Sequence, residues 1–311
     1  CPVGALTLKP FRFRARVWNL HKVAATCGEC SRGCSITVEV LRKGEVKRIR
    51  PRHNEAVNGY WMCDHGRFAL DVLNPEQRLI GGRLRSETRG WDAMAVEDAL
   101  ATARDMLVTH GATLIVASPF STVEDGRQLL ALSKTLSARL VFVSPEPSDL
   151  ADDLLHTGDP CPNRRGLTDL GFEGLPPAEI LQALGEVESA LLVGERLGAL
   201  LSARPRAEDP DQENTGGEEV AAQGLAGLPT SLRTILLGCE PIEDSGIDVA
   251  VGIPNQVERV GTWINVDGQR GCIAPARPAP AGVWTTARVL DTLHTLLTTK
   301  LEATAGEVTA P

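Results

Sequence analysis

The chain has 311 residues, 42% of them hydrophobic and 23% charged, which is enough for two domains and typical of a globular protein. Its net charge of −8 is unevenly divided, because residues 1–67 carry 13 Lys and Arg against 5 Asp and Glu. No apolar run approaches the roughly 18 residues of a membrane span, so a transmembrane helix is excluded. A basic first part favours an acidic protein neighbour over nucleic acid, because the basic residues surround a cluster of cysteine thiols.

The chain begins with CPVGAL, without a Met or a signal-like apolar segment. This start predicts a processed chain or a piece of a longer one. The lack of a transport signal, together with clustered thiols, indicates a reducing compartment in which cysteines bind metal.

Three of the eight cysteines stand in one stretch of eight residues, CGECSRGC (27–34), and Cys63 follows after a gap of 28 residues. Within that gap, the stretch SITVEVLRKGEVKRIR (35–50) alternates apolar and polar residues on both sides of a Lys-Gly pair, which predicts a β-hairpin. The hairpin would return Cys63 to the other three thiols. Residues from about 20 to 70 are therefore predicted to form a small β-rich metal module.

Three kinds of cross-link are compatible with these cysteines. Structural zinc usually takes two short pairs of ligands, and three thiols in one loop suit that pattern poorly. A [4Fe–4S] cluster needs four thiolates at four corners, so one loop can supply three and a remote cysteine the fourth. A disulfide framework is disfavoured by the length of the chain and the expected compartment. The spacing favours iron–sulfur, with zinc as the alternative.

Beyond about residue 84 the pattern changes to short apolar runs separated by amphipathic stretches. Buried strands alternating with helices predict an open, mostly parallel α/β sheet. The remaining Cys161, Cys239 and Cys272 stand alone and are predicted to be small buried hydrophobes. The segment GTWINVDGQRG (261–271) lacks a strand–GxGxxG–helix context and is predicted to be a turn. The predicted strands are 113–118, 140–144, 190–194, 234–238 and 248–252, the helices are 95–110, 125–138 and 285–300, and a polar insertion is predicted at 203–227.

The stretches CGECSRGC and NEAVNGYWMCDHGRF resemble the iron–sulfur segment of the molybdopterin-oxidoreductase superfamily, and more closely that of the large iron–sulfur subunits of bacterial NADH-quinone oxidoreductases (respiratory complex I). The opening CPVGALTLKPFRFRARVWNL resembles the end of the ferredoxin-like region of those subunits. The resemblance implies a tail of that region at 1–19, a [4Fe–4S] module at 20–83 and, at 84–311, an α/β domain of degenerate molybdopterin-oxidoreductase type.

The resemblance also implies the ligands. Cys27, Cys30, Cys34 and Cys63 would bind one [4Fe–4S] cluster, and Cys1 would bind a second cluster completed upstream. A rival interpretation of Cys1 is the lipid-bearing first residue of a lipoprotein. His65 stands where molybdopterin enzymes carry a Lys shortly after the fourth cysteine, and it is predicted to be structural or to tune the cluster.

The expected function is electron transfer and scaffolding in complex I, with no molybdopterin and no complete active site in this chain. The expected partners are other peripheral-arm subunits, on the cytoplasmic side of the cell membrane, with no nucleic acid and no membrane span. The alternatives are a fragment of a molybdopterin- or tungsten-dependent dehydrogenase, such as a formate dehydrogenase, and a zinc-stabilised binding module.

Overall fold

A computed structural model describes residues 5–86, 90–202, 228–229, 231–242 and 246–308, and the predicted insertion at 203–227 lies outside them. The contacts divide the chain into two compact units. The first unit comprises residues 1–76, 147–162 and 255–279, and the second comprises 77–146, 163–254 and 280–311. The domain limits expected from the sequence stay a prediction. The first unit takes in two segments, 147–162 and 255–279, that the sequence pattern places in the α/β domain.

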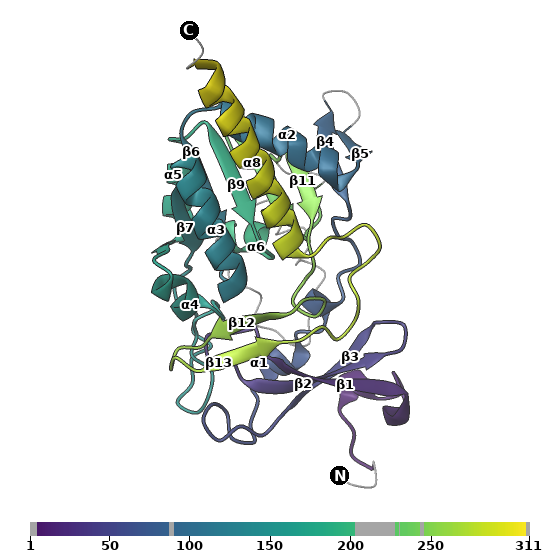
Figure 1. Cartoon of the computed structure of the whole chain (residues 1–311). Helices are drawn as coiled ribbons and strands as arrows, with labels where there is room; N and C mark the ends of the chain where they lie inside the picture. The colour runs from purple at the N-terminus through teal and green to yellow at the C-terminus, as the bar shows by residue number, and fades with distance from the viewer. Residues whose placement is uncertain (1–4, 87–89, 203–227, 230, 243–245, 309–311) are drawn as a thin grey trace. The chain divides into compact units, whose positions relative to one another are not determined.

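The first unit is built on an antiparallel sheet in the order β1-β2-β3, formed by Leu20–Thr26, Ser35–Leu41 and Val46–Pro51 (Figure 1). The β2–β3 hairpin confirms the prediction for residues 35–50, and β1 is a further strand that pairs with β2 along its whole length. Alternation along the hairpin places one set of aliphatic side chains in a core, namely Ile36, Val38, Val40, Val46 and Ile49. Short helices complete the unit: η1 (Lys9–Phe11), η2 (Val17–Asn19), α1 (Asp64–Phe68) and η3 (Asp71–Leu73).

The segment 261–271, which was predicted to be a turn, instead lies in a second hairpin of the first unit. Its strands are β12 (Gly261–Ile264) and β13 (Arg270–Ile273), which pair antiparallel. Only the residues between them turn, with Gly268 at a φ of +80°. Thr26 Oγ1 at the end of β1 donates a hydrogen bond of 2.9 Å to the carbonyl oxygen of Cys272, which ties this hairpin to the sheet.

The second unit holds one sheet of eight strands in the order β5-β4-β11-β10-β9-β6-β7-β8. The strands from β11 to β8 are parallel, and β4 and β5 form an antiparallel edge, so the predicted open and mostly parallel sheet is confirmed. The five strands predicted from apolar runs are β6, β7, β9, β10 and β11. The strands span Gly82–Ser86 (β4), Gly90–Met94 (β5), Thr113–Ala117 (β6), Arg139–Val143 (β7), Glu173–Leu175 (β8), Ser189–Val193 (β9), Arg233–Gly238 (β10) and Val249–Gly252 (β11).

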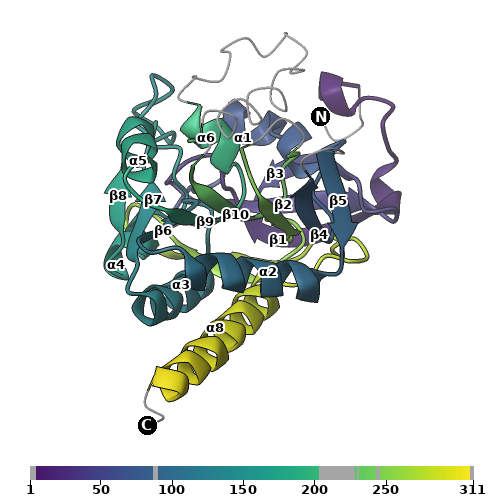
Figure 2. The same ribbon diagram turned by 90° about the horizontal axis from the view of Figure 1, so that it is seen from above.

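Helices cover both faces of this sheet, as Figure 2 shows. Helices α2 (Val96–Thr109), α3 (Val123–Leu136) and α8 (Thr286–Val308) share a core with one face, to which β6 contributes Ile115 and Ala117. Helices α5 (Pro177–Leu184) and α6 (Leu197–Leu201) share a core with the other face, to which β6 contributes Leu114 and Val116. A short helix α4 (Arg164–Asp169) precedes β8. Central strands are continuous apolar runs because both of their faces are buried.

The strand order reverses between β6 and β9, the place at which open α/β sheets commonly bind ligands. Here the loops that follow these two strands contact each other closely. Ser118 Oγ donates a hydrogen bond of 2.6 Å to the carbonyl oxygen of Glu195, and the Arg196 guanidinium lies 4.3 Å above the centre of the Phe120 ring. A methyl group at Gly194 would lie 2.4 Å from Ser118 Cβ, so the two loops are in close contact.

Glu240, two residues after the end of β10, makes the stability of the second unit depend on pH. Burial raises the pKa of its carboxyl from 4.5 to about 7, although a hydrogen bond of 3.1 Å from the Gly198 backbone N–H lowers it. The charge on Glu195 also raises the pKa, and that on Arg196 lowers it. Because the folded chain retains a proton that the unfolded chain releases, the free energy of unfolding decreases between these two pKa values as the pH rises.

We therefore expect Glu240→Gln to leave stability unchanged at about pH 4 and to raise it by on the order of 2 kcal/mol at about pH 8. Urea unfolding of both proteins at the two pH values measures the difference. The same difference in the free energy of unfolding at both pH values would contradict the raised pKa of Glu240.

Candidate metal centre

The loop between β1 and β2 carries Cys27, Cys30 and Cys34. It is closed at its base by a hydrogen bond of 2.9 Å from the Cys27 N–H to the Cys34 carbonyl oxygen. Gly33, with a φ of +60°, permits the reversal before Cys34, a backbone conformation that other residues rarely adopt. The short spacing therefore gathers three thiols on a single turn of chain.

Cys63 enters the site at the N-terminus of α1. Its side chain caps the helix, because Sγ accepts a hydrogen bond of 3.4 Å from the Gly66 N–H. Asn58 ties the preceding segment to the sheet, since its Oδ1 accepts from the Ser35 N–H at 2.9 Å and its Nδ2 donates to the Trp61 carbonyl oxygen at 2.9 Å. The chain that leaves the β2–β3 hairpin is thus held beside the start of β2, next to Cys34.

The backbone of Gly66 lies between two of the thiols. A methyl group built on it would lie 2.8 Å from Cys27 Sγ and 3.7 Å from Cys63 Sγ. Cys27, Cys30 and Cys34 are buried, with 7%, 4% and 4% of their surface exposed, and Cys63 is partly buried. Cys63 therefore lies beside the loop that carries the other three cysteines, in one largely buried region.

The thiols oppose one another's ionisation. Burial raises the pKa of Cys34 to about 12, with further increases from Cys30 and Cys63. Burial also raises the pKa of Cys27 well above its usual value, and the charges on Glu29, Cys34 and Cys30 raise it further. Four thiolates would be stable here only with positive charge among them, and iron in a cluster supplies that charge. The donor set therefore fits an iron–sulfur cluster.

In the described part of the chain, no three His, Cys, Asp or Glu side chains are grouped closely enough to hold a single metal ion. The ligands of a [4Fe–4S] cluster have a different arrangement, because each thiolate binds a different iron and the set surrounds a volume.

Two distant segments of the first unit hold the cysteine loop in place, and neither was predicted to do so. From one side, the Ser31 N–H donates to the Asp159 carbonyl oxygen at 2.8 Å, and Arg32 Nε donates to the Leu155 carbonyl oxygen at 3.2 Å. From the other, Asn265 Nδ2 donates to the Arg32 carbonyl oxygen at 3.0 Å. These contacts join residues more than 120 positions apart, so a local sequence pattern could not predict them.

The other predicted site residues lie elsewhere or outside the described chain. Cys1 is outside the described residues, so its role as a ligand stays a prediction. Cys161 and Cys239 are buried as expected, but Cys272 is exposed, and the prediction of a buried side chain there is wrong. Cys272 lies on β13 of a two-stranded hairpin, where one face is open to solvent. His65 Nε2 lies 3.6 Å from Glu29 Oε2, beside the cysteine loop.

Gly66 allows a sharp test of this packing. In a helix, replacing Gly by Ala normally stabilises by up to about 1 kcal/mol. Here the added methyl group would overlap Cys27 Sγ, so we expect Gly66→Ala to destabilise the first unit by about 1–3 kcal/mol and to lower its iron content. Iron analysis and thermal unfolding measure both effects. Gly111→Ala is the matched control, because its nearest neighbours are atoms of the exposed Glu188 carboxylate. Full iron content in Gly66→Ala would contradict the packing.

Comparison with known proteins agrees with this geometry. Residues 20–75, which contain all four converging cysteines, match the family model of the molybdopterin oxidoreductase Fe4S4 domain. The chain is 35% identical over 175 residues to NADH-quinone oxidoreductase subunit 3 of Thermus thermophilus. These aligned residues make up 51% of this chain and 22% of that protein. Two further relatives are also NADH-quinone oxidoreductase subunits. The one from Rhizobium meliloti is 42% identical over 87 residues (28% of this chain and 10% of that protein), and the one from Shewanella oneidensis is 29% identical over 193 residues (60% and 20%).

The resemblance stated from the residues is thereby confirmed, and the match supports a [4Fe–4S] cluster as the group bound by residues 20–75. The chain spans between 10% and 22% of the length of these relatives.

Proposed function

We propose that this chain is part of an iron–sulfur electron-transfer and scaffold subunit of NADH-quinone oxidoreductase, and that Cys27, Cys30, Cys34 and Cys63 ligate one [4Fe–4S] cluster. The observation that carries the proposal is that Cys63 and the loop of Cys27, Cys30 and Cys34 lie together, with Gly66 against the Sγ atoms of Cys27 and Cys63, within a segment similar to an Fe4S4 domain. A bound cluster of this type accepts and releases single electrons.

The chain's own residues would hold and shield this group. The Gly66 N–H already points to Cys63 Sγ, and a hydrogen bond of this kind stabilises negative charge on a thiolate. Burial of the cysteine loop keeps water away. The hydrogen bonds to Ser31 and Arg32 fix the loop, so that three ligands stay in place when the charge of the site changes.

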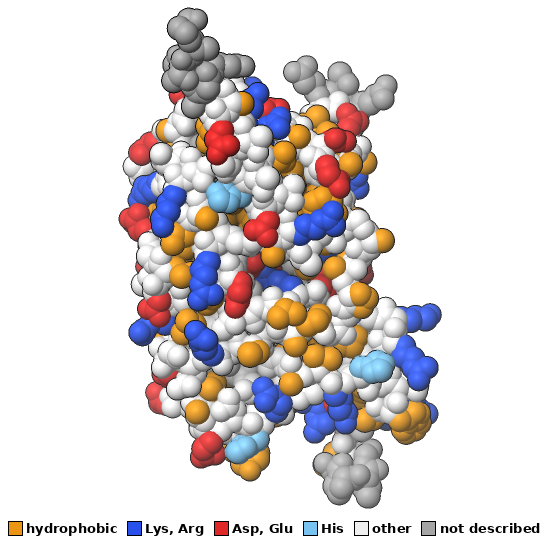
Figure 3. All heavy atoms as spheres, viewed as in Figure 1, with side chains coloured by type: hydrophobic (Ala, Val, Ile, Leu, Met, Phe, Trp, Pro, Cys, Tyr) orange, Lys and Arg blue, Asp and Glu red, His pale blue; other side chains and the backbone are white. Residues whose placement is uncertain are grey.

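The remaining chemistry of such a complex would belong to neighbouring subunits, which would bind NADH and quinone. Among the described residues, no helix has the length and apolar character needed to cross a membrane. We propose that the chain docks on other subunits at the cytoplasmic side of the membrane, and two features of the surface of the first unit support docking. Basic side chains gather around the β2–β3 hairpin in Figure 3, and large apolar side chains of the same unit are exposed: Leu6, Phe13, Trp18, Tyr60 and Trp61.

We further propose that the second unit binds no molybdopterin. The support is the close contact between the two loops at the switch point of its sheet, where Ser118 hydrogen-bonds to the Glu195 carbonyl oxygen and Arg196 lies on the Phe120 ring. Metal analysis of protein made in cells with intact pterin synthesis should find no stoichiometric molybdenum or tungsten. A bound pterin would instead favour a dehydrogenase.

The test of the cluster is the composition of anaerobically purified protein. We expect about four irons and four sulfides per chain, with Cys1 accessible to alkylation, because its cluster would need ligands from a longer chain. A longer protein that includes upstream cysteines should gain further clusters and protect Cys1. Colourless protein with one zinc per chain would contradict the proposal.

A further inference from the structure

The segment 155–159 forms one side of the cysteine site. Besides the hydrogen bonds from Ser31 and Arg32, the hydroxyls of Ser31 and Thr157 lie 2.8 Å apart. The Leu155 side chain packs in the same buried cluster as Cys27 and Cys34. The residue between Leu155 and Thr157 is therefore held over the loop that carries three of the thiols.

That residue is His156, whose surface is only 4% exposed. A hydrogen bond from the backbone fixes the tautomer of its ring. The Gly158 backbone N–H donates to its Nδ1 at 3.0 Å, so Nδ1 carries no proton. Burial lowers the pKa of His156, although Asp152 and Glu29 oppose this, which favours the neutral ring. The single ring proton is thus on Nε2.

Nε2 of His156 is buried and has no hydrogen-bond partner among the described residues. A buried donor without a partner normally costs about 1–3 kcal/mol, so its retention calls for an acceptor. The ring lies edge-on to His65, with 5.4 Å between the ring centres, and His65 is two residues after Cys63. His156 is therefore bracketed by the cysteine loop on one side and by the Cys63 helix on the other.

We infer that His156 donates its Nε2–H to a sulfur of the cluster held by the four cysteines, and so makes that cluster easier to reduce. The inference rests on the proposed cluster site. It adds a residue that contacts the cluster and lies far in the sequence from the four cysteines. Reduction adds one negative charge to the cluster, and a hydrogen bond to sulfur stabilises the reduced form more than the oxidised form.

The test is a redox titration of the full chain, in which electron paramagnetic resonance measures the fraction of reduced cluster. We expect His156→Leu to lower the equilibrium constant for one-electron reduction about tenfold, which corresponds to about 59 mV. His156→Gln, whose side-chain amide can donate, should recover most of this loss. His21→Leu is the matched control, because His21 is an exposed histidine on β1 of the same unit.

A second measurement does not depend on how the Leu variant folds. In protein labelled with ¹⁵N-histidine, pulsed resonance of the reduced cluster should show a nitrogen coupling that disappears in His156→Gln while His65 is retained. His156→Leu with four irons and an unchanged potential, or labelled protein with no such coupling, would overturn the inference. Absence of iron from the unmodified chain would overturn the proposed function itself.

Discussion

Replacing Cys30 with serine should remove the cluster and loosen the whole first unit. Cys30 is 4% exposed and lies between Cys27 and Cys34 in one loop, so its loss would remove one of the four proposed ligands. Binding energies of structural metal sites are on the order of 10 kcal/mol, and much of this is folding energy. We expect a loss of at least about 3 kcal/mol in the stability of residues 20–70, together with loss of most of the iron.

Hydrogen exchange by mass spectrometry separates this effect from general unfolding. Peptides from β1, β2 and α1 should lose protection, whereas peptides from β6 and β9 of the second unit should keep theirs. Cys272→Ser is the control, because Cys272 is an exposed thiol of the same unit. Wild-type iron content and protection in Cys30→Ser would mean that Cys30 is not a ligand.

The sequence was sufficient to predict the features that depend on local pattern. Central strands such as β6 and β9 are buried on both faces, so their runs of Leu, Ile and Val are visible without any partner strand. The cysteine spacing predicted that these thiols lie close together, because three of them belong to one loop. The β2–β3 hairpin was visible in its alternation and its Gly44 turn, where φ is +91°.

The features that were missed depend on contacts between distant segments. β1 has the burial pattern of a strand exposed along its middle, with polar His21 and Lys22, so its sequence carries little strand signal before it pairs with β2. The segments 147–162 and 255–279 are turn-rich and polar, and they join the first unit through hydrogen bonds to the cysteine loop and to the hairpin. His156 was missed for the same reason, because its setting exists only after that segment has folded onto the loop.

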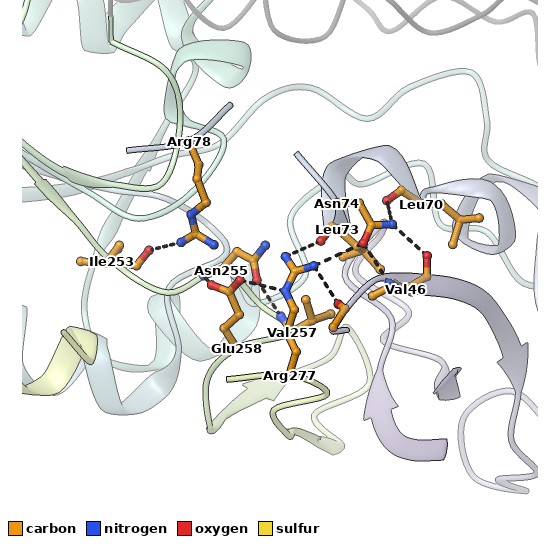
Figure 4. Close-up of polar contacts among 11 residues, drawn as sticks. Val46, Leu70, Leu73, Asn74, Arg78, Ile253, Asn255, Val257, Glu258 and Arg277 are labelled. Carbon is orange, nitrogen blue, oxygen red and sulfur yellow. Dashed lines mark hydrogen bonds and ion pairs between the residues drawn. The ribbon is translucent and has the colours of Figure 1, made fainter. Parts of the chain in front are cut away.

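One arginine links the hairpin to one of these recruited segments. Arg277 Nε donates to Glu258 Oε1 at 2.9 Å, and the other guanidinium nitrogens donate to the Leu73 carbonyl oxygen (2.8 Å) and to Asn74 Oδ1 (3.3 Å), as Figure 4 shows. The guanidinium also donates to the carbonyl oxygen of Gly44 at 3.1 Å. The Glu258 side chain is 1% exposed, and that of Arg277 is 15% exposed. A planar guanidinium can serve these acceptors at once, which a lysine ammonium cannot do.

We expect Arg277→Ala to destabilise the first unit by about 3–5 kcal/mol, because it removes the positive charge that is paired with the buried Glu258 carboxylate. Arg277→Lys should lose less, about 1–2 kcal/mol, since it keeps the charge but not the fork of donors. Opening free energies from hydrogen exchange of peptides covering residues 41–46 and 70–74 report the change. Asp267→Asn, which breaks the exposed pair with Arg32, is the control and should cost at most about 1 kcal/mol.

A second substitution identifies the source of that cost. If the cost of Arg277→Ala comes from the loss of positive charge beside the buried carboxylate, the double variant Glu258→Gln/Arg277→Ala should be more stable than Arg277→Ala alone, because the amide has no charge to bury. The amide oxygen of glutamine can still accept the hydrogen bond of 3.1 Å that the Asn255 N–H donates to Glu258. Equal stability of the single and double variants would show that the lost hydrogen bonds to Gly44 and Leu73, and not the buried charge, carry the contribution of Arg277.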